Sequence, residues 1–225
     1  MRRAYPDGLP PSIRDFMAFE EHVRGARAVT GRGDVPEAWY EAPAFYFSNP
    51  AAVYADGDEV PKPPDTAALD YELELACVIG VEGRPEGFTI MNDFSARDLQ
   101  ASEMRVGLGP AKGKDFATSL GPVVVSVDEL PAELDMRAIA RVNGEVRTDS
   151  RTGAMYFSWE QLLERAAHNT PGLRPGDVIG SGTVGRGCIL EHGDGRWLQV
   201  GDVVELEIEG IGVLRNRVVS ARASV

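Results

Sequence analysis

The sequence has few basic residues for its length, and this shortage excludes two classes of partner. Among its 225 residues, 23 Lys and Arg stand against 35 Asp and Glu, which gives a net charge of −12. Binding to a nucleic acid or to an anionic membrane surface needs a basic footprint, so we expect neither partner. The same charge balance means that an anionic substrate needs a local positive centre, either a metal ion or a few placed cations.

Cysteines and long apolar runs are also scarce. The two cysteines, Cys77 and Cys188, both lie in apolar sequence contexts. They predict buried free thiols in a reducing compartment. The sequence contains no CxxC motif and no Cys/His cluster with zinc spacing. It has no apolar run near twenty residues and no signal-peptide pattern, so we expect a cytoplasmic, soluble protein.

The hydrophobic pattern predicts a mainly β fold with a few helices in a single domain, preceded by an N-terminal arm over residues 1–11. Ser12 opens a predicted helix over residues 13–27, with Phe16, Phe19 and Val23 on one face. Two further helices are expected over residues 95–106 and 159–168. Strands are expected at 45–47, 69–81, 88–93, in a hairpin over 136–146, in a strand, glycine-rich loop and strand over 171–191, and in a hairpin over 198–219.

Carboxylates cluster around the strand predicted over residues 69–81. Glu72 and Glu74 occupy alternate positions of this strand, so they share one face. Asp93 follows the next apolar run, at the end of a second strand. Carboxylates on one face repel each other and are costly to desolvate, so solvent, basic partners or a cation must compensate. The alternatives are a solvated strand face and an all-oxygen site for Mg²⁺, Mn²⁺ or Ca²⁺; the third carboxylate favours the site.

Three histidines are present, and one has a context that favours chemistry. His22 lies seven residues after Asp15, which places both on roughly the same face of the predicted helix. A histidine with a carboxylate partner is the usual general base at neutral pH. His168 and His192 are interpreted as ordinary surface or core residues.

Several polar residues near the carboxylates remain open to two interpretations. Lys114 lies in a loop with glycines nearby, either as a solvated lysine or as the partner of an oxyanion near the metal. Arg97 and Gln100 are one helical turn apart, so both can point into one site. The loop around Thr183 resembles a phosphate cradle but lacks a GKS/T or GxGxxG register.

Six motifs in order carry a resemblance to a known family. They are RDFMAFEEH (14–22), APAFYFSNP (42–50), DYELELACVIG (70–80), MNDFSARDLQ (91–100), GPAKGKDFATSLGP (109–122) and PGDVIGSGTVGRGCILE (175–191). Over nearly its whole length the chain resembles the fumarylacetoacetate hydrolase family. The resemblance implies a mixed β-sandwich roll with a catalytic domain over residues 12–225, a homodimer, a divalent cation (Mg²⁺ or Mn²⁺, with Ca²⁺ as an alternative) and a small oxo-acid substrate.

The resemblance also implies roles for individual residues. The metal ligands would be Glu72, Glu74 and Asp93, with Asp15 matching a fourth carboxylate. His22 matches the catalytic histidine, Glu191 the glutamate that orients it, and Lys114 the lysine that stabilises developing negative charge. The substrate-facing positions would be Tyr46, Arg97, Gln100 and Thr183.

Two departures from the family pattern bear on the substrate. Gly25 stands where the acylpyruvase-like branch has a glutamate three positions after its histidine, so His22 with Glu191 is the better dyad. Met17 stands where the hydrolase branch has a tyrosine, which argues against fumarylacetoacetate itself. The expected function is hydrolytic C–C cleavage of a 1,3-diketo acid. The alternatives are isomerisation or decarboxylation of a 2-hydroxy-dienoate at the same site, and a non-catalytic protein that binds a metal and an oxo acid.

Overall fold

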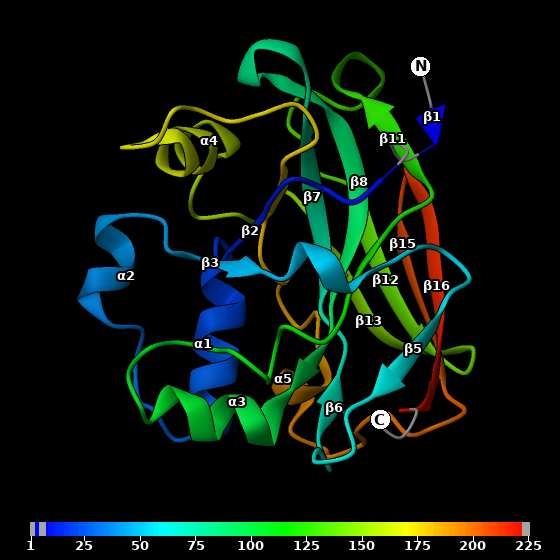
Figure 1. Ribbon diagram of the computed structural model, residues 1–225. Helices are drawn as coiled ribbons and strands as arrows, with labels where there is room; N and C mark the ends of the chain where they lie inside the picture. The colour runs from blue at the N-terminus through cyan, green and yellow to red at the C-terminus, as the bar shows by residue number, and fades with distance from the viewer. Residues whose placement is uncertain (1–2, 5–7, 222–225) are drawn as a thin grey trace.

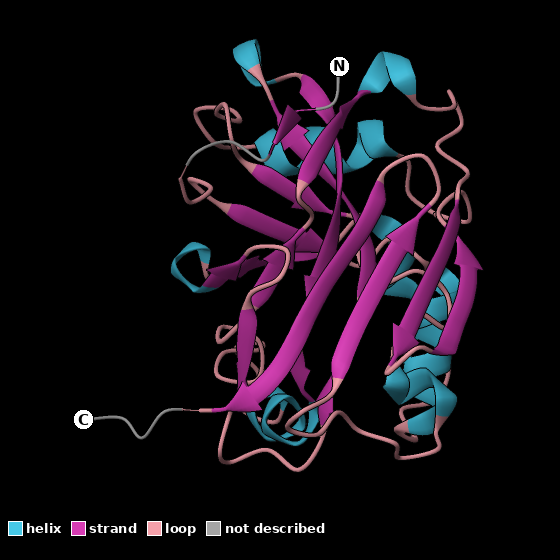
Figure 2. Ribbon diagram, turned by 90° about the vertical axis from the view of Figure 1, so that its right-hand side faces the viewer, coloured by secondary structure: helices cyan, strands magenta, loops and turns pink. Residues whose placement is uncertain are grey.

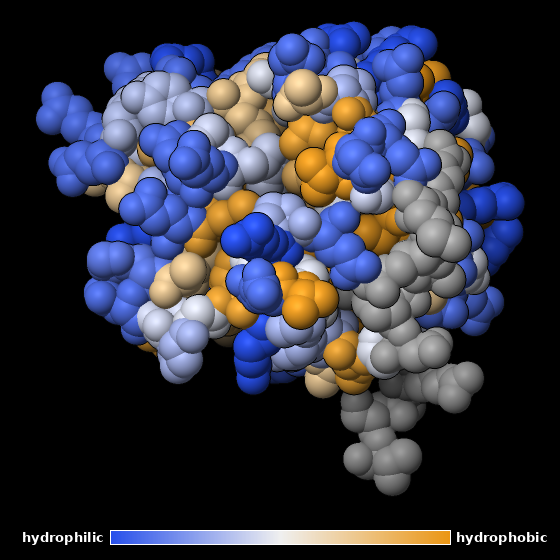
Figure 3. All heavy atoms as spheres, turned by 90° about the horizontal axis from the view of Figure 1, so that it is seen from above, coloured by the Kyte–Doolittle hydropathy of each residue, from blue (hydrophilic) through white to orange (hydrophobic). Residues whose placement is uncertain are grey.

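Two β-sheets form the centre of the protein, and helices gather on the side of the larger sheet that faces away from the smaller one (Figure 1). The structure is a computed structural model that describes residues 3–4 and 8–221. Strands outnumber helices along the described chain, which confirms the expected mainly β fold. In the view of Figure 3, hydrophobic residues occupy small areas separated by hydrophilic ones.

Within the described residues, nine strands form the larger sheet, in the order β1-β11-β8-β7-β14-β2-β3, with β10 beside β8 and β4 beside β10. Their bounds are β1 (Arg3–Ala4), β2 (Ile13–Phe16), β3 (Phe45–Ser48), β4 (Val53–Tyr54), β7 (Leu73–Ile79), β8 (Pro85–Asp93), β10 (Thr118–Leu120), β11 (Val123–Ser126) and β14 (Val178–Gly180). Because β14 lies between β2 and β7 in the sheet but far from both in sequence, residues of distant segments meet on one face.

The smaller sheet faces the viewer in Figure 2. In the described part of the chain it has five strands, in the order β13 (Glu145–Arg151), β12 (Arg137–Val142), β15 (Val203–Ile208), β16 (Gly212–Ser220) and β5 (Glu59–Lys62). Asn143 and Gly144 both have positive φ, 53° and 81°, at the turn between β12 and β13. This confirms the hairpin predicted there. A separate short pair joins β6 (Leu69–Asp70) to β9 (Ser95–Ala96).

The main hydrophobic core lies between the two sheets. Leu73, Leu75, Cys77 and Ile79 alternate along β7, and each is fully buried in one cluster with side chains of β15 and β16. These four side chains form an apolar row on the core face of β7. Since successive side chains of a strand point to opposite faces, Glu74 points away from this core, toward the helices. The alternation in one strand therefore separates the apolar core from the polar site.

Five α-helices and three 3₁₀ turns connect the strands of the described chain. They are α1 (Glu20–Val29), α2 (Glu37–Glu41), α3 (Arg97–Met104), α4 (Trp159–Ala167), α5 (Ile189–His192), η1 (Pro50–Ala52), η2 (Val81–Gly83) and η3 (Val127–Glu129). The helices predicted over 95–106 and 159–168 are confirmed as α3 and α4. At the start of α4, Ser158 and Gln161 form a reciprocal capping box, which satisfies two backbone N–H groups of the first turn.

Two element predictions are wrong. The helix expected over 13–27 is a strand, β2, followed by a helix that begins only at Glu20. β2 is buried throughout and pairs with β14 on one side and β3 on the other, so sheet hydrogen bonds replace the helical ones. The strand expected at the end of segment 171–191 is the short helix α5. The carboxylate of Asp70 accepts hydrogen bonds from the backbone N–H groups of Ile189 and Leu190, which stabilises the helix start.

The arm expected over residues 1–11 lies partly outside the described residues. Of residues 1–7, the structure describes only the backbone of residues 3–4, which form β1. β1 pairs with β11 in antiparallel fashion. In the described chain, no helix has both the length and the apolar composition that crossing a membrane requires.

Candidate active site

Four carboxylates from different segments converge on one buried spot. Asp15 comes from β2, Glu72 from the segment between β6 and β7, Glu74 from β7 and Asp93 from the end of β8. One oxygen of each lies within 4.8 Å of the others. Glu74 and Asp93 are fully buried, and Asp15 and Glu72 are 3% and 4% exposed. The interpretation of Glu72 and Glu74 as a solvated strand face is therefore wrong.

A glycine makes this convergence possible. β14 lies between β2 and β7, and its last residue, Gly180, pairs with Asp15 on one side and Ala76 on the other. A Cβ at Gly180 would lie 2.5 Å from Oδ1 of Asp15 and 3.0 Å from Oε2 of Glu74. Only a residue without a side chain lets these two carboxylates meet across the intervening strand. A glycine inside a strand often marks such a close approach, so the sequence did carry a signal for Gly180.

The electrostatics of the cluster are unbalanced without a cation. Burial, together with the charge of neighbouring carboxylates, raises the pKa values of Asp15 and Glu74 well above their ordinary range, and burial also raises the pKa of Asp93. Burial acts in the same direction on Glu72, but the nearby cations Arg97 and Lys114 outweigh it and hold its pKa below the ordinary value. Without a cation, the cluster thus takes up protons more readily than separate exposed carboxylates do.

The residues fit a divalent cation. Oδ1 of Asp15 and Oδ1 of Asp93 are buried and have no hydrogen-bond partner among the described residues. Buried polar atoms are rarely left without a partner, and these two point to a ligand that carries positive charge. The donor set consists only of carboxylate oxygens, which suits Mg²⁺, Mn²⁺ or Ca²⁺ and not a thiolate-seeking metal. Asp15, Glu72, Glu74 and Asp93 are the residues that could hold such an ion.

His22 faces this cluster from α1. Its Nδ1 lies 2.8 Å from Oε2 of Glu191, on α5, and its Nε2 lies 4.0 Å from Oε1 of Glu72. A carboxylate only accepts hydrogen bonds, so Nδ1 carries a proton, and Nε2 is the nitrogen that faces the carboxylates. The predicted meeting of His22 with Asp15 on one helix is wrong in its reason, because Asp15 lies on β2. Both residues nevertheless line one cavity.

Two buried cations flank the carboxylates, and the first is Lys114. It is 4% exposed and donates hydrogen bonds from Nζ to Asp93 and, at 2.5 Å, to Glu72. The interpretation of Lys114 as a solvated loop lysine is therefore wrong. Burial disfavours the charged amine, but Asp93 and Glu72 outweigh it and raise its pKa above the ordinary value. Lys114 is thus a fixed ammonium group beside the site.

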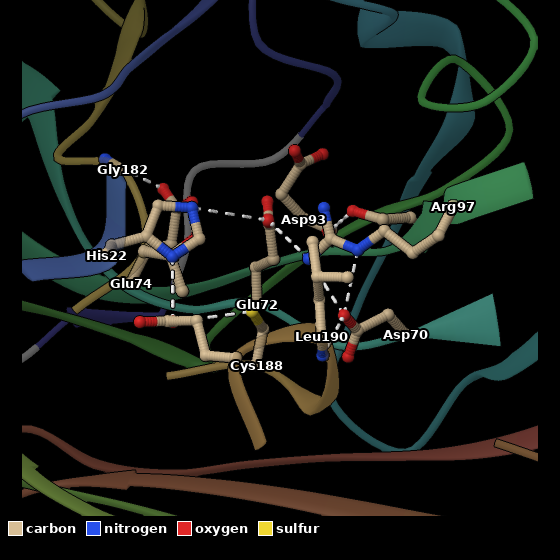
Figure 4. A network of polar contacts seen from close by, with 12 residues as sticks. His22, Asp70, Glu72, Glu74, Asp93, Arg97, Gly182, Cys188 and Leu190 are labelled. Atoms are coloured by element: carbon tan, nitrogen blue, oxygen red, sulfur yellow. Dashed lines mark hydrogen bonds and ion pairs between the residues drawn. The ribbon is translucent and has the colours of Figure 1, made fainter. Parts of the chain in front are cut away.

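The second cation, Arg97, is held more firmly than the sequence indicated. Its guanidinium donates to Asp70 and Glu72 at 2.8 Å and 2.7 Å (Figure 4). It also donates to Gln100 at 3.2 Å. Asp70 is a site residue that the sequence did not single out, although it precedes Glu72 and Glu74 in the same alternating row of acids. Because Asp70 also caps α5, the Asp70–Arg97 pair connects the helix that carries Glu191 with the carboxylate cluster.

The remaining predicted substrate-facing residues contact the carboxylates. The Tyr46 hydroxyl on β3 donates to Oδ2 of Asp93. The Thr183 hydroxyl lies 3.5 Å from Oε1 of Glu74, and the backbone N–H of Gly182 donates to Oε2 of the same residue at 3.1 Å. The loop predicted as a weak phosphate cradle thus holds a carboxylate, and its backbone N–H is directed at Glu74.

A cavity of about 430 Å³ opens over this cluster. The polar wall includes Asp15, His22, Glu72, Glu74, Arg97 and Lys114, whereas the apolar wall includes Phe16, Val23, Trp39, Phe45, Met104 and Leu190. Small-molecule sites commonly combine such an apolar wall with a few convergent polar groups. The arrangement places one histidine, one ammonium group and a carboxylate cluster around a space for a small ligand.

A family model described as "Fumarylacetoacetate (FAA) hydrolase C-terminal" matches residues 12–219. The chain belongs to the fumarylacetoacetate hydrolase family. Members of this family are enzymes, among them hydrolases, isomerases and tautomerases. The oxaloacetate tautomerase YisK of Bacillus subtilis is 33% identical over 225 aligned residues, which cover 93% of this chain and 71% of that protein.

Other relatives agree with this family assignment. An uncharacterized protein of Staphylococcus epidermidis is 36% identical, and the match covers 78% of this chain but 61% of that protein. The chain thus spans about three fifths of the length of that relative. A solved structure of fumarylpyruvate hydrolase from Pseudomonas aeruginosa, in complex with Mn²⁺ and pyruvate, superposes with a TM-score of 0.76 at 25% identity and covers 96% of this chain and 93% of that one. This chain and the Pseudomonas aeruginosa hydrolase therefore share one fold.

We predict that the metal-free protein becomes less stable as the pH rises above about 5. Asp15, Glu74 and Asp93 have raised pKa values in the folded state, so above their ordinary values near 4 the folded state binds more protons than the unfolded state. Stability therefore falls with pH in that window. The lowered pKa of Glu72 acts in the opposite sense, but only below about pH 5.

Urea unfolding from pH 5 to 8 in EDTA measures this slope. When Mn²⁺ replaces EDTA, it should raise the unfolding free energy at each pH, because it binds the folded state only. The increase should be largest at pH 8. Glu74→Gln should flatten the slope in EDTA. A stability that rises from pH 5 to 8 in EDTA would contradict the prediction.

Gly180→Ala should weaken Mn²⁺ binding, because the added Cβ pushes Asp15 and Glu74 apart. The matched control is Ile179→Val, one residue earlier on β14 and buried in the opposite face, which should cost about 0.5–1.5 kcal/mol of stability and leave Mn²⁺ affinity intact. Calorimetric titration at fixed pH gives both affinities. Equal Mn²⁺ affinity in Gly180→Ala and the wild type would show that Asp15 and Glu74 do not bind the ion together.

Proposed function

We propose that this protein is a divalent-metal-dependent hydrolase that cleaves a C–C bond in a 1,3-diketo acid such as a short acylpyruvate. The observation that carries the proposal is the dyad of His22 and Glu191. In this dyad Nδ1 of His22 contacts Glu191, and Nε2 faces the carboxylate cluster, 4.0 Å from Glu72. A protein that only binds an oxo acid needs no base at this position. The pyruvate bound together with Mn²⁺ in the Pseudomonas aeruginosa structure belongs to the same chemical class as the expected product.

The chain's own residues account for the proton transfers. A divalent ion bound by Asp15, Glu72, Glu74 and Asp93 would act as a Lewis acid toward the keto oxygens of the substrate. His22 accepts a proton at Nε2 from a water molecule, and Glu191 stabilises the imidazolium through Nδ1–H. The oxygen of that water forms a bond with the carbonyl carbon distal to the carboxylate.

The second half of the reaction needs a cation and a proton donor. Cleavage of the C–C bond leaves its electron pair on the pyruvate fragment as an enolate. Lys114 has three N–H donors and uses two of them on Glu72 and Asp93, which leaves one for the enolate oxygen. His22 returns its proton to the carbon, and the products are pyruvate and a second carboxylic acid. Water supplies both hydrogen atoms and the oxygen that the products gain.

A second candidate is enol–keto tautomerisation or isomerisation at the same site. Relatives named as oxaloacetate tautomerases, from Bacillus subtilis and Bos taurus, are 33% and 35% identical to this chain. A structure of 5-carboxymethyl-2-hydroxymuconate delta-isomerase from Mycobacterium smegmatis superposes with a TM-score of 0.74 at 29% identity. Such reactions need His22 as a proton shuttle but no attacking water.

The homodimer and the cytoplasmic location expected from the sequence stay predictions.

Product analysis by NMR in D₂O separates the candidates. With Mg²⁺ and a short acylpyruvate, C–C hydrolysis yields pyruvate and a second acid, and EDTA abolishes both. Tautomerisation instead accelerates deuterium exchange of the acidic CH of an oxo acid such as oxaloacetate without any new acid. Release of CO₂ without a second acid identifies a decarboxylase, and binding without turnover identifies a non-catalytic binding protein.

His22→Ala should lower kcat by roughly 10²–10⁴-fold, because the general base is lost, whereas Mn²⁺ binding should persist. His168→Ala is the matched control, since His168 lies at the end of α4 and outside the residues that line the cavity. Steady-state kinetics and calorimetric titration measure the two quantities. Full activity in His22→Ala would refute the assignment of the base.

Gly25→Ala should lower activity without lowering stability. Gly25 lies inside α1, where alanine is favoured over glycine by up to about 1 kcal/mol. Its new Cβ would lie 2.9 Å from Oε1 and 3.2 Å from Cγ of Glu191, and the flexible end of that side chain must move. We expect an unchanged or raised unfolding free energy together with a reduced kcat. An unaltered kcat would mean that the exact position of the Glu191 carboxylate does not affect the rate.

A further inference from the structure

The thiol of Cys188 lies beside the dyad and has no part in the mechanism described above. Its Sγ is 3.4 Å from Oε2 of Glu191, the same oxygen that accepts the hydrogen bond from Nδ1 of His22. His22, Cys188 and Glu191 form one compact group (Figure 4 shows His22 and Cys188). The sequence context of Cys188 is apolar, but its thiol contacts a carboxylate.

The Glu191 carboxylate is fixed from two sides. Its Oε1 accepts a hydrogen bond from the backbone N–H of Arg186 at 2.9 Å, and Gly25 leaves room for that oxygen. Its Oε2 contacts His22 and the thiol. The side chain of Glu191 is 2% exposed, so bulk water does not offer a ready substitute for either partner. Among the described residues, the thiol is the side chain that can hold Oε2 in place when His22 changes its charge.

The backbone of Cys188 is itself anchored to the site. Cys188 forms an isolated antiparallel bridge with Glu72, and it directly precedes α5, the helix that carries Glu191. A fully buried residue with its backbone paired to one site residue and its side chain directed at another has little freedom to move. Its thiol therefore sits at a defined point between the carboxylate cluster and the dyad.

We propose that Cys188 is a positioning residue whose S–H donates to Glu191 Oε2 and so holds the carboxylate where it can orient His22. An S–H group is a weak donor, but a hydrogen bond to a charged acceptor is stronger than one between neutral groups. Without it, Oε2 keeps only His22 as a side-chain partner among the described residues, so the oxygen that orients Nδ1–H is held less firmly. The effect on catalysis rests on the proposed function, whereas the effect on the imidazole does not.

Cys77 supplies a matched control. It is also a fully buried free thiol, but it lies in the apolar row of β7, where its Sγ is 3.8 Å from the carbonyl oxygen of its neighbour Val78. Cys77→Ala and Cys188→Ala both remove one buried sulfur from the protein. If Cys188 only filled space, the two variants would differ little in catalysis.

The kinetic experiment compares Cys188→Ala, Cys188→Ser and Cys77→Ala with the wild type. We expect Cys188→Ala to lower kcat about 10-fold with little change in KM, because a hydrogen bond to a charged group is lost. Cys188→Ser keeps a donor and should recover most of the loss, and Cys77→Ala should stay within about twofold of the wild type. Equal kcat for the two alanine variants, or a serine variant as slow as Cys188→Ala, would overturn the proposal.

A spectroscopic experiment needs no substrate and separates this proposal from the proposed function. The Nδ1–H proton of His22 gives an NMR resonance in the Mg²⁺-loaded, ¹⁵N-labelled protein, which is assigned by its loss in His22→Gln. Cys188→Ala should shift or broaden this resonance, and Cys77→Ala should leave it unchanged. An unchanged resonance in Cys188→Ala would refute the positioning role. If the wild type cleaves no diketo acid but the resonance responds as expected, only the proposed function fails.

Discussion

The burial of four carboxylates in one spot is the constraint on which the rest of the site depends. Like charges this close, removed from water, are strongly unfavourable unless protons, cations or hydrogen-bond donors compensate. The surrounding residues are arranged for that purpose: Lys114 and Arg97 supply fixed positive charge, and Gly182 and Tyr46 supply donors. Among the described residues, two oxygens of the cluster remain buried without a partner, and a divalent ion bound there would satisfy both.

The scaffold reaches this arrangement by placing segments that are distant in sequence next to each other. β2, β14 and β7 lie side by side, and the glycine at the end of β14 removes the one side chain that would separate Asp15 from Glu74. On the other side, Asp70 joins Arg97 to the start of α5, which brings Glu191 to His22. The acid–base dyad and the carboxylate cluster are therefore two parts of one hydrogen-bonded network.

The pairing of His22 with Glu191 has a steric counterpart at position 25. A Cβ at position 25 would lie 2.9 Å from Oε1 of Glu191, so a side chain there and Glu191 in its present place exclude each other. The present place of Glu191 therefore favours glycine at position 25.

The sequence by itself determined the alternating pattern of β7, the hairpin at Asn143-Gly144, helix α4 and the set of acidic and basic residues that converge on the site. The first three features depend on local periodicity and turn chemistry, which neighbouring residues encode. The full set of site residues was implied by the resemblance to the family. It did not determine that residues 13–16 form a strand, that α5 is helical, or that Cys188, Asp70 and Gly180 belong to the site.

Those outcomes depend on partners that are distant along the chain. Asp70 and Ile189, whose hydrogen bond stabilises the start of α5, are 119 positions apart. Residues 13–16 have a sequence that suits a helix, but pairing with β14 and β3 makes them a strand. Such long-range pairing can override local propensity, because the hydrogen bonds and burial that it supplies outweigh differences of less than about 1 kcal/mol per residue. Only the tertiary structure decided these features.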